Sequence, residues 1–199
     1  MKRRDFCRAG LAAGFTATYP FLAGCGKETP VSAPPAAAAK AETGIAAVSL
    51  DGASIELERA AVNELGESLS GRLILSGHPE YDTVRKVWNG MHDKRPALIA
   101  RCANDSDVQN AVTFARERDL LVAVRGGGHS WPGKSVCDGG IMIDLAEMTD
   151  VMVDPATQRA SARGGALLGH LDTASLKHGL VTTAGVVSHT GVGGYTLGG

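Results

Sequence analysis

Glycine is concentrated in the second half of this 199-residue chain, where it forms two dense segments. The chain has 26 glycines, of which 16 lie between Gly126 and Gly199, against an average usage of about 7%. Glycines fill positions 126–128, which we expect to form a loop, and a second glycine-rich segment that we expect to be a loop runs from Thr190 to Gly199. Such segments let several backbone N–H groups converge on one anion, although a tight turn with positive φ would produce the same run. Two such segments in one chain favour a dinucleotide ligand.

The charge of the chain is nearly balanced. It has 20 Lys plus Arg against 21 Asp plus Glu, which gives a net charge of -1. This balance supplies no excess positive field for a phosphate backbone, so we expect no nucleic-acid partner. A run of about 20 apolar residues that could span a bilayer permanently is also absent from the sequence.

Residues 1–24 have the layout of an export signal, with basic residues first, then an uncharged stretch and a small-residue end. The pair Arg3-Arg4 resembles the twin-arginine signal, a receptor-read address that carries folded proteins. The segment from Leu22 to Cys25 resembles the lipobox of bacterial lipoproteins, in which the cysteine receives the lipid. An ordinary signal peptide that is cleaved nearby, with Cys25 incidental, is the alternative.

Residues 25–43 are rich in alanine and proline and cannot build a core, so we expect an extended linker. Together with the signal, this linker predicts an exported bacterial protein. We expect it in the periplasm or on the membrane, held there only by a lipid anchor on Cys25.

The remainder of the chain alternates between helix and strand patterns. We expect a helical lead-in over 44–93, with helices at 55–65 and 82–89. A βαβ unit follows, in which the capping box that starts at Ser106 opens the helix. Its strands are expected at 97–101 and 121–124, with further strands at 141–145, 151–154 and 159–162, a helix at 166–177 and a strand-like segment at 181–183. The strands at 151–154 and 159–162 flank a hairpin loop.

The cysteines and histidines of this part supply no metal site. Cys102 and Cys137 are expected to be buried free thiols, although they could pair in the periplasm. His170 and His178 lie eight residues apart on one expected helix, too far apart to bind one metal ion. No metal is therefore expected.

The segment from Gly128 to Ser135 matches the P-loop pattern, with Lys134 for the phosphates and Ser135 for magnesium. A P-loop must open a helix, however, and the glycines at 139–140 would break a helix in its first turn. A nucleotide triphosphatase is therefore only a minor alternative.

Several motifs occur in one order along the chain. They are Lys94 to Ile99, Val124 to Ser130, Ile143 to Leu145, Asp154-Pro155 and Gly191 to Gly199, preceded by Tyr81 to Asn89. Together they closely resemble the berberine-bridge-enzyme-like branch of the vanillyl-alcohol oxidase and p-cresol methylhydroxylase flavoproteins. The resemblance covers the chain from about Leu69 to its end.

This resemblance implies an α+β fold, namely a two-subdomain FAD-binding domain of the p-cresol methylhydroxylase type that occupies residues 94–199. Relatives continue past the second glycine segment, so we expect the domain to be incomplete at its C-terminus. The resemblance implies that FAD is bound by Arg125, Gly126, Gly127, Gly128, His129, Ser130, Thr190, Gly191, Gly193 and Gly194.

His129 stands where many relatives attach FAD covalently, so the resemblance implies a covalent bond there. A histidine that only hydrogen-bonds a phosphate is the alternative. Relatives with a second covalent bond carry a cysteine just before the second glycine segment, where this chain has Val187, and this excludes a second bond. His189 in the same segment could touch the flavin.

The activity implied by the resemblance is oxidoreduction. An alcohol, a sugar or a related donor would pass hydride to FAD, and oxygen or another acceptor would reoxidise the flavin. The alternative is a truncated, inactive remnant that binds FAD weakly or not at all. The sequence identifies no catalytic base.

Overall fold

The computed structural model describes residues 44–198, and all statements below concern this part of the chain. The expected export signal at 1–24, the linker at 25–43 and the anchor residue Cys25 lie outside the described residues.

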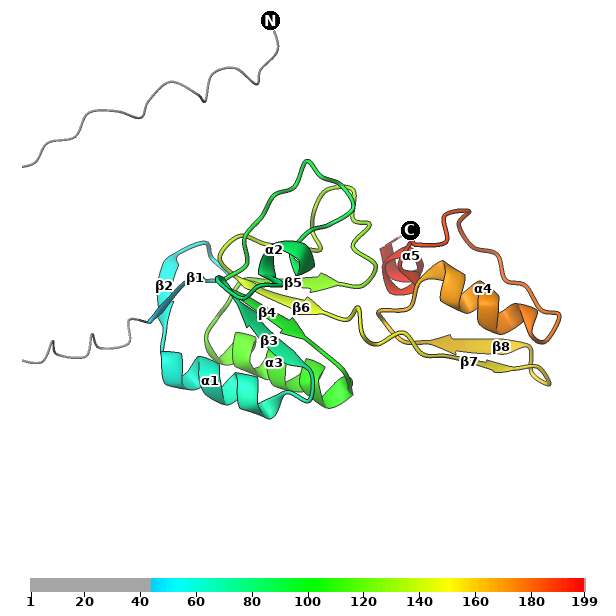
Figure 1. Cartoon of the computed structure of the whole chain (residues 1–199), viewed down its shortest axis with the longest axis horizontal. Helices are drawn as coiled ribbons and strands as arrows, with labels where there is room; N and C mark the ends of the chain where they lie inside the picture. Colours follow the sequence, from blue (N-terminus) through cyan, green and yellow to red (C-terminus); the bar gives the residue numbers. More distant parts are fainter. Residues whose placement is uncertain (1–43, 199) are drawn as a thin grey trace, which may run out of the picture. The chain divides into compact units, whose positions relative to one another are not determined.

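A four-stranded sheet forms the centre of the fold (Figure 1). Its strands are β3 (Arg72–Leu75), β4 (Leu98–Arg101), β5 (Val122–Arg125) and β6 (Ile141–Asp144), in the order β3-β4-β6-β5. Strand β6 is parallel to both of its neighbours, whereas β3 is antiparallel to β4. The predicted βαβ unit, β4 followed by α3 (Asp105–Glu117) and β5, is confirmed, with β6 inserted between its two strands.

Side chains alternate across this sheet and build two cores. Ile141 and Ile143 of β6 belong to one core, together with buried residues of α1 (Arg59–Ser68) and α3. Met142 points to the opposite face, where it joins a smaller core with residues of the short helix α2 (Tyr81–Val84). Because consecutive side chains of a strand point to opposite faces, a strand that is apolar throughout must be covered on both sides.

The prediction of a helix at 55–65 was wrong in its first part. Residues 54–57 form strand β2 (Ser54–Leu57), which pairs with β1 (Ile45–Val48) in an antiparallel hairpin. In β2, Ile55 and Leu57 alternate with polar residues, a period of two that favours a strand. The sequence also suggested Gly66 as the end of this helix, but Gly66 lies inside α1, which continues to Ser68. The segment 44–93 is consequently not only helical, because it contains three strands.

The helix predicted at 82–89 is also shorter than expected, since α2 ends at Val84. Tertiary hydrogen bonds replace its continuation. The carbonyl of Val84 accepts from the guanidinium of Arg125 at 2.9 Å, and the N–H of Trp88 donates to the carbonyl of Gly128 at 3.0 Å. These bonds hold the segment after α2 against the first glycine segment.

Helix α3 begins two residues earlier than the predicted capping box with Ser106 as N-cap. Its N-cap is Asn104, whose side chain accepts a hydrogen bond from the N–H of Asp107 at 3.0 Å. The carboxylate of Asp107 is buried and accepts from the N–H groups of Ser70, Gly71 and Ala103. Asp107 therefore joins the start of α3 to the chain that enters β3.

The last part of the structure is a hairpin with two helices. The predicted hairpin is confirmed, with β7 (Val151–Asp154) antiparallel to β8 (Arg159–Ala162). The helix predicted at 166–177 is α4 (Leu168–Leu176), and it packs on this hairpin. Residues 181–183 do not form the predicted strand, because the described chain offers them no partner strand and Val181 is 84% exposed.

Two further observations concern absences in residues 44–198. None of the helices described is long and apolar enough to cross a bilayer. Cys102 and Cys137 are buried and unpaired, as the sequence predicted.

Candidate functional site

Three charged residues lie side by side at the carboxyl edge of the parallel strands. Arg101 of β4 and Arg125 of β5 are both in register with Asp144 of β6. The Asp144 carboxylate is fully buried, 3.4 Å from the Arg125 guanidinium and 3.7 Å from that of Arg101. Burial raises the pKa of Asp144, although both arginines favour its charged form. Ligands of such sheets bind outside this edge, so the segments that leave it are candidates for a site.

The first glycine segment leaves the sheet directly at this edge, after Arg125. Within the described chain, the backbone N–H groups from Gly126 to Ser130 donate to no protein acceptor. Gly128 has a φ of 70°, a left-handed conformation that favours glycine. The segment is therefore both a turn with positive φ and a row of free N–H donors.

The second glycine segment touches the first. A Cβ atom added to Gly127 would lie 2.4 Å from the backbone nitrogen of Gly191, and one added to Gly191 would lie 2.4 Å from that of Gly127. Gly191 also forms an isolated bridge with Leu167. The absence of side chains at both positions is what lets the two backbones meet.

The second segment was expected to be a loop, but its residues from Val192 onward form the helix α5 (Val192–Gly198). The N–H of Val192 donates to the carbonyl of Ala166 at 2.8 Å, which ties the start of the helix to the segment before α4. Gly193 lies inside α5, where an added Cβ atom would approach the carbonyl oxygen of Gly164 to 3.0 Å. Tertiary packing thus explains a glycine in a helix, where it is otherwise unfavourable.

A third pair of glycines, which the sequence analysis missed, completes the arrangement. A Cβ atom added to Gly126 would lie 2.8 Å from the carbonyl oxygen of Gly164. A Cβ atom added to Gly165 would lie 1.7 Å from the carbonyl oxygen of Leu145. Gly164 thereby lies against both glycine segments. The signal was present in the sequence, since this pair directly follows the expected hairpin.

A cavity of about 370 Å³ opens beside the contact between the segments. His129 lies in it, in contact with two other rings. The Trp88 ring stacks on the His129 imidazole at 5.1 Å between centroids and 17° between planes, and the His189 ring lies 4.7 Å away at 54°. The cavity lining comprises Val87, Trp88, Arg125, Gly126, Gly127, His129, Ala146, Thr149, Gly165, Leu167, His170 and His189.

Burial lowers the pKa of His129, and the neighbouring His189 lowers it further. The imidazole of His129 is therefore neutral over a wider pH range than that of a free histidine, and a neutral imidazole nitrogen can act as a nucleophile.

The predicted site residues divide into two groups. Arg125, Gly126, Gly127 and His129 line the cavity, and Gly191 contacts Gly127. Four others lie outside the lining: Gly128 turns the first segment, Ser130 accepts from the N–H of Lys134, Thr190 accepts from the N–H of Leu168, and Gly194 faces open space. Gly193 lines a different groove.

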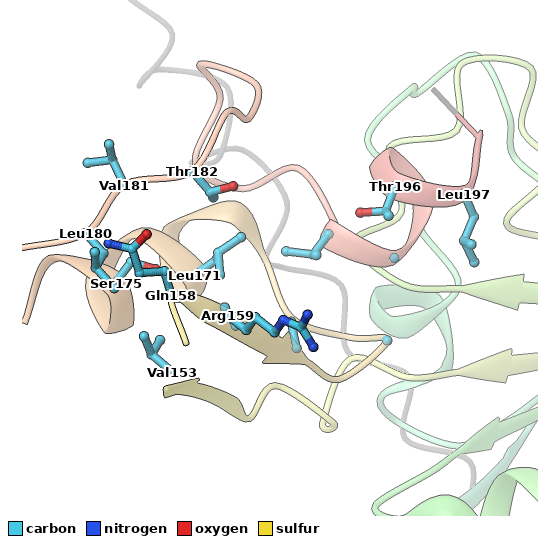
Figure 2. A pocket seen from close by; sticks show the side chains of 15 residues that line it. Val153, Gln158, Arg159, Leu171, Ser175, Leu180, Val181, Thr182, Thr196 and Leu197 are labelled. Carbon is cyan, nitrogen blue, oxygen red and sulfur yellow. The ribbon is translucent and has the colours of Figure 1, made fainter. Parts of the chain in front are cut away.

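That groove, of about 530 Å³, lies over the β7–β8 hairpin (Figure 2). Thr196 and Leu197 of α5 stand on one side of it, with Leu171 and Ser175 of α4 on the other. It carries no cluster of acids, bases or nucleophiles. The larger volume therefore does not make it the chemical centre, and we assign the site to the smaller cavity at His129.

The P-loop alternative does not fit this geometry. A P-loop requires a helix after Ser135, but residues 131–140 form turns and bends. Ser135 is buried with an unpartnered hydroxyl, whereas Lys134 is exposed. The two side chains do not face a common phosphate site.

Comparison with known proteins identifies the family. Residues 96–199 match the family described as FAD binding domain. The chain belongs to this family. Its relatives are flavoproteins of the berberine-bridge-enzyme-like and vanillyl-alcohol-oxidase type, which confirms the resemblance and the predicted α+β fold.

Two curated relatives illustrate the sequence similarity of this FAD-binding domain. An FAD-linked oxidoreductase of Dictyostelium discoideum is 42% identical over 139 residues, which cover 69% of this chain and 30% of the relative. The (R)-6-hydroxynicotine oxidase of Paenarthrobacter nicotinovorans is 36% identical over 132 residues, which cover 66% of this chain and 29% of the relative.

Solved structures of similar proteins have the same fold over the matched part of this chain. The wild-type BBE-like 1 protein of Physcomitrella patens is 28% identical with a TM-score of 0.65, over 69% of this chain and 30% of that one. The xylooligosaccharide oxidase of Myceliophthora thermophila, solved with xylobiose, is 28% identical with a TM-score of 0.61. This match covers 69% of this chain and 30% of that one. The chain thus spans about 30% of the length of the curated relatives it matches.

The residues of the FAD-binding domain fit FAD, as two observations show. The N–H groups from Gly126 to Ser130 are free to donate to a pyrophosphate. The Nε atom of Arg125 is buried without a partner and lies beside Gly128, so a charged donor is available at the same place. FAD, when bound, supplies the redox chemistry that the protein's own side chains lack.

Proposed function

We propose that this protein is an FAD-dependent oxidoreductase that takes hydride from an alcohol, a sugar or a related donor and carries its FAD on one covalent bond from His129. One observation carries the proposal. His129 belongs to the row of free backbone donors and lies in the cavity with its imidazole stacked on Trp88. Donors that hold a pyrophosphate would bring the same edge of the flavin repeatedly to this imidazole.

The reaction class is supported by the names of similar proteins. One acts as an oxidase of (R)-6-hydroxynicotine and another as an oxidase of xylooligosaccharides. We extend to this protein only the oxidation of a small organic donor, with oxygen or another acceptor reoxidising the flavin.

Single attachment follows from the second segment. Val187 occupies the position of the second attachment cysteine, and it is 41% exposed. Among the described residues, the two cysteines are buried elsewhere, in the cores beside β4 and before β6. We therefore propose that backbone contacts with the glycine segments supply the rest of the FAD affinity.

The test is denaturation of the flavin-loaded protein. Wild-type protein should retain yellow fluorescence after SDS treatment, whereas His129→Ala should bind FAD in the native state and release it on denaturation. His178→Ala, which changes an exposed histidine after α4, is the matched control and should retain the flavin. Complete release from the wild type would show that His129 is only a phosphate-side contact.

We also propose that the protein is exported and lipid-anchored. The twin-arginine-like start and the lipobox-like end of the signal support this proposal, and two changes separate its halves. Arg3→Lys with Arg4→Lys should block export, and Cys25→Ala should move the exported protein from the membrane fraction to the soluble one. Unchanged export or unchanged fractionation would refute the corresponding half.

A further inference from the structure

His129 and His189 come from segments far apart in the sequence, yet their rings are in contact. Their centroids lie 4.7 Å apart with the planes tilted by 54°, and both residues line the cavity of about 370 Å³. The Trp88 ring also stacks on His129, at 5.1 Å between centroids. The imidazole of His129 is therefore in contact with one indole and one imidazole, and these contacts restrict its rotation.

The titratable groups around His129 are all basic. Arg125, His170 and His189 are the titratable residues that share its cavity, and the described lining contains no carboxylate. The nearest acid on this sheet edge, Asp144, is directed to Arg125 and Arg101. A proton on His129 is consequently opposed by its neighbours as well as by burial, which agrees with its lowered pKa.

We propose that His189 is a positioning residue for the bond between His129 and FAD, holding the ring in place and receiving the proton that the imidazole loses. The inference rests on the proposed function, because it requires that His129 be the attachment residue.

Attachment forms one C–N bond and consumes one molecule of dioxygen. An unprotonated imidazole nitrogen of His129 forms a bond to the methyl carbon at the edge of the flavin, and one C–H bond of that carbon breaks. Two electrons reduce the flavin, one proton leaves the carbon, and a second proton leaves the imidazole for His189 and then for solvent. Dioxygen takes up two electrons and two protons and leaves as hydrogen peroxide, which restores oxidised flavin.

Attachment should therefore depend on pH with a midpoint set by His129. The reaction needs the neutral imidazole, so its rate should fall as the pH falls through the lowered pKa of His129. Removing His189 takes away one of the causes that lower this pKa, and the midpoint should move to higher pH. Loss of a proton acceptor should also slow attachment by at least about tenfold.

The experiment uses the full protein, produced without flavin and mixed with FAD between about pH 5 and pH 9. Fluorescence of the protein band after SDS treatment measures covalent flavin, and quenching of free FAD measures native binding. His189→Gln should bind FAD, attach it slowly and show the higher midpoint. Imidazole added to His189→Ala should restore part of the rate, whereas His178→Gln should match the wild type.

Each result has one meaning. An unchanged rate and midpoint in His189→Gln would overturn the role of His189, and a reduced yield with an unchanged midpoint would assign it a merely structural role. A wild type that binds FAD but attaches none at any pH would overturn the proposed function instead. If His189→Gln fails to bind FAD, His189→Asn provides the same comparison.

Discussion

The backbones of Gly127 and Gly191 approach so closely that a Cβ atom on either residue would lie 2.4 Å from the main-chain nitrogen of the other. This contact joins the segment that leaves β5 to the segment that enters α5. The cavity with His129 and His189 lies beside this contact, and Gly127 is part of its lining.

We expect Gly127→Ala and Gly191→Ala each to force the two segments apart. Overpacking of this kind costs about 1–3 kcal/mol, and the displaced donors should weaken FAD binding by at least about tenfold. Thermal unfolding and titration with FAD measure the two effects. Wild-type affinity in both variants would contradict the proposed role of the contact.

Gly66→Ala is the matched control for these substitutions. An added Cβ atom there makes only ordinary contacts, 3.5 Å from the Leu73 side chain, and Gly66 lies inside α1. Alanine is the better helix former, so stability should rise by about 0.5–1 kcal/mol with unchanged FAD affinity. Destabilisation would mean that α1 requires a glycine at this position.

Trp88→Ala should loosen the His129 ring. A stacked aromatic pair is worth about 0.5–1.5 kcal/mol, so covalent attachment should slow by about two- to tenfold, and the pH midpoint should move to higher pH because less of the His129 ring is buried. Trp88→Phe should retain most of the rate. Fluorescence of denatured protein against time gives both rates, and an unaffected Trp88→Ala would show that the stack does not orient His129.

Asp107 should make stability depend on pH. Burial raises the pKa of its carboxyl group, but hydrogen bonds from Ala103, Ser70 and Gly71 outweigh burial and lower it below the usual 3.8. The stabilisation is therefore complete above about pH 4 and is lost as the pH falls through the lowered pKa. Asp107→Asn should be less stable than wild type at neutral pH, and the difference should shrink in acid.

Asp107→Ala should cost about 3 kcal/mol in the free energy of unfolding, because three backbone N–H groups lose the buried carboxylate that accepts from them. The exposed neighbour Asp105, whose partner is Arg163, provides the control. Asp105→Ala should cost less than about 1 kcal/mol. Equal losses in denaturant titrations would contradict this account.

The two cysteines should be unreactive in the folded protein. Burial raises the pKa of Cys102 to about 12 and that of Cys137 to about 11, so almost no thiolate is present at neutral pH. Peptide mass spectrometry should find both thiols unmodified by iodoacetamide until denaturant is added. Labelling of the native protein would show that the cores open locally.

The sequence alone determined the features that depend on neighbouring residues. The turn residues between β7 and β8 were sufficient to predict that hairpin, and the motifs around Gly126–His129 and Gly191–Gly194 carried the family resemblance that implied the α+β fold and FAD. Each of these depends on a short motif, which a linear sequence contains in full.

Only the tertiary structure decided which distant residues meet. The contact of Gly127 with Gly191, the enclosure of His129 by Trp88 and His189, and the helix α5 all depend on how the sheet brings separate segments to one edge. Local propensity predicted a longer helix through Trp88 and a loop after Gly191. Both predictions failed because hydrogen bonds and close packing between segments outweigh the small propensity differences of single residues.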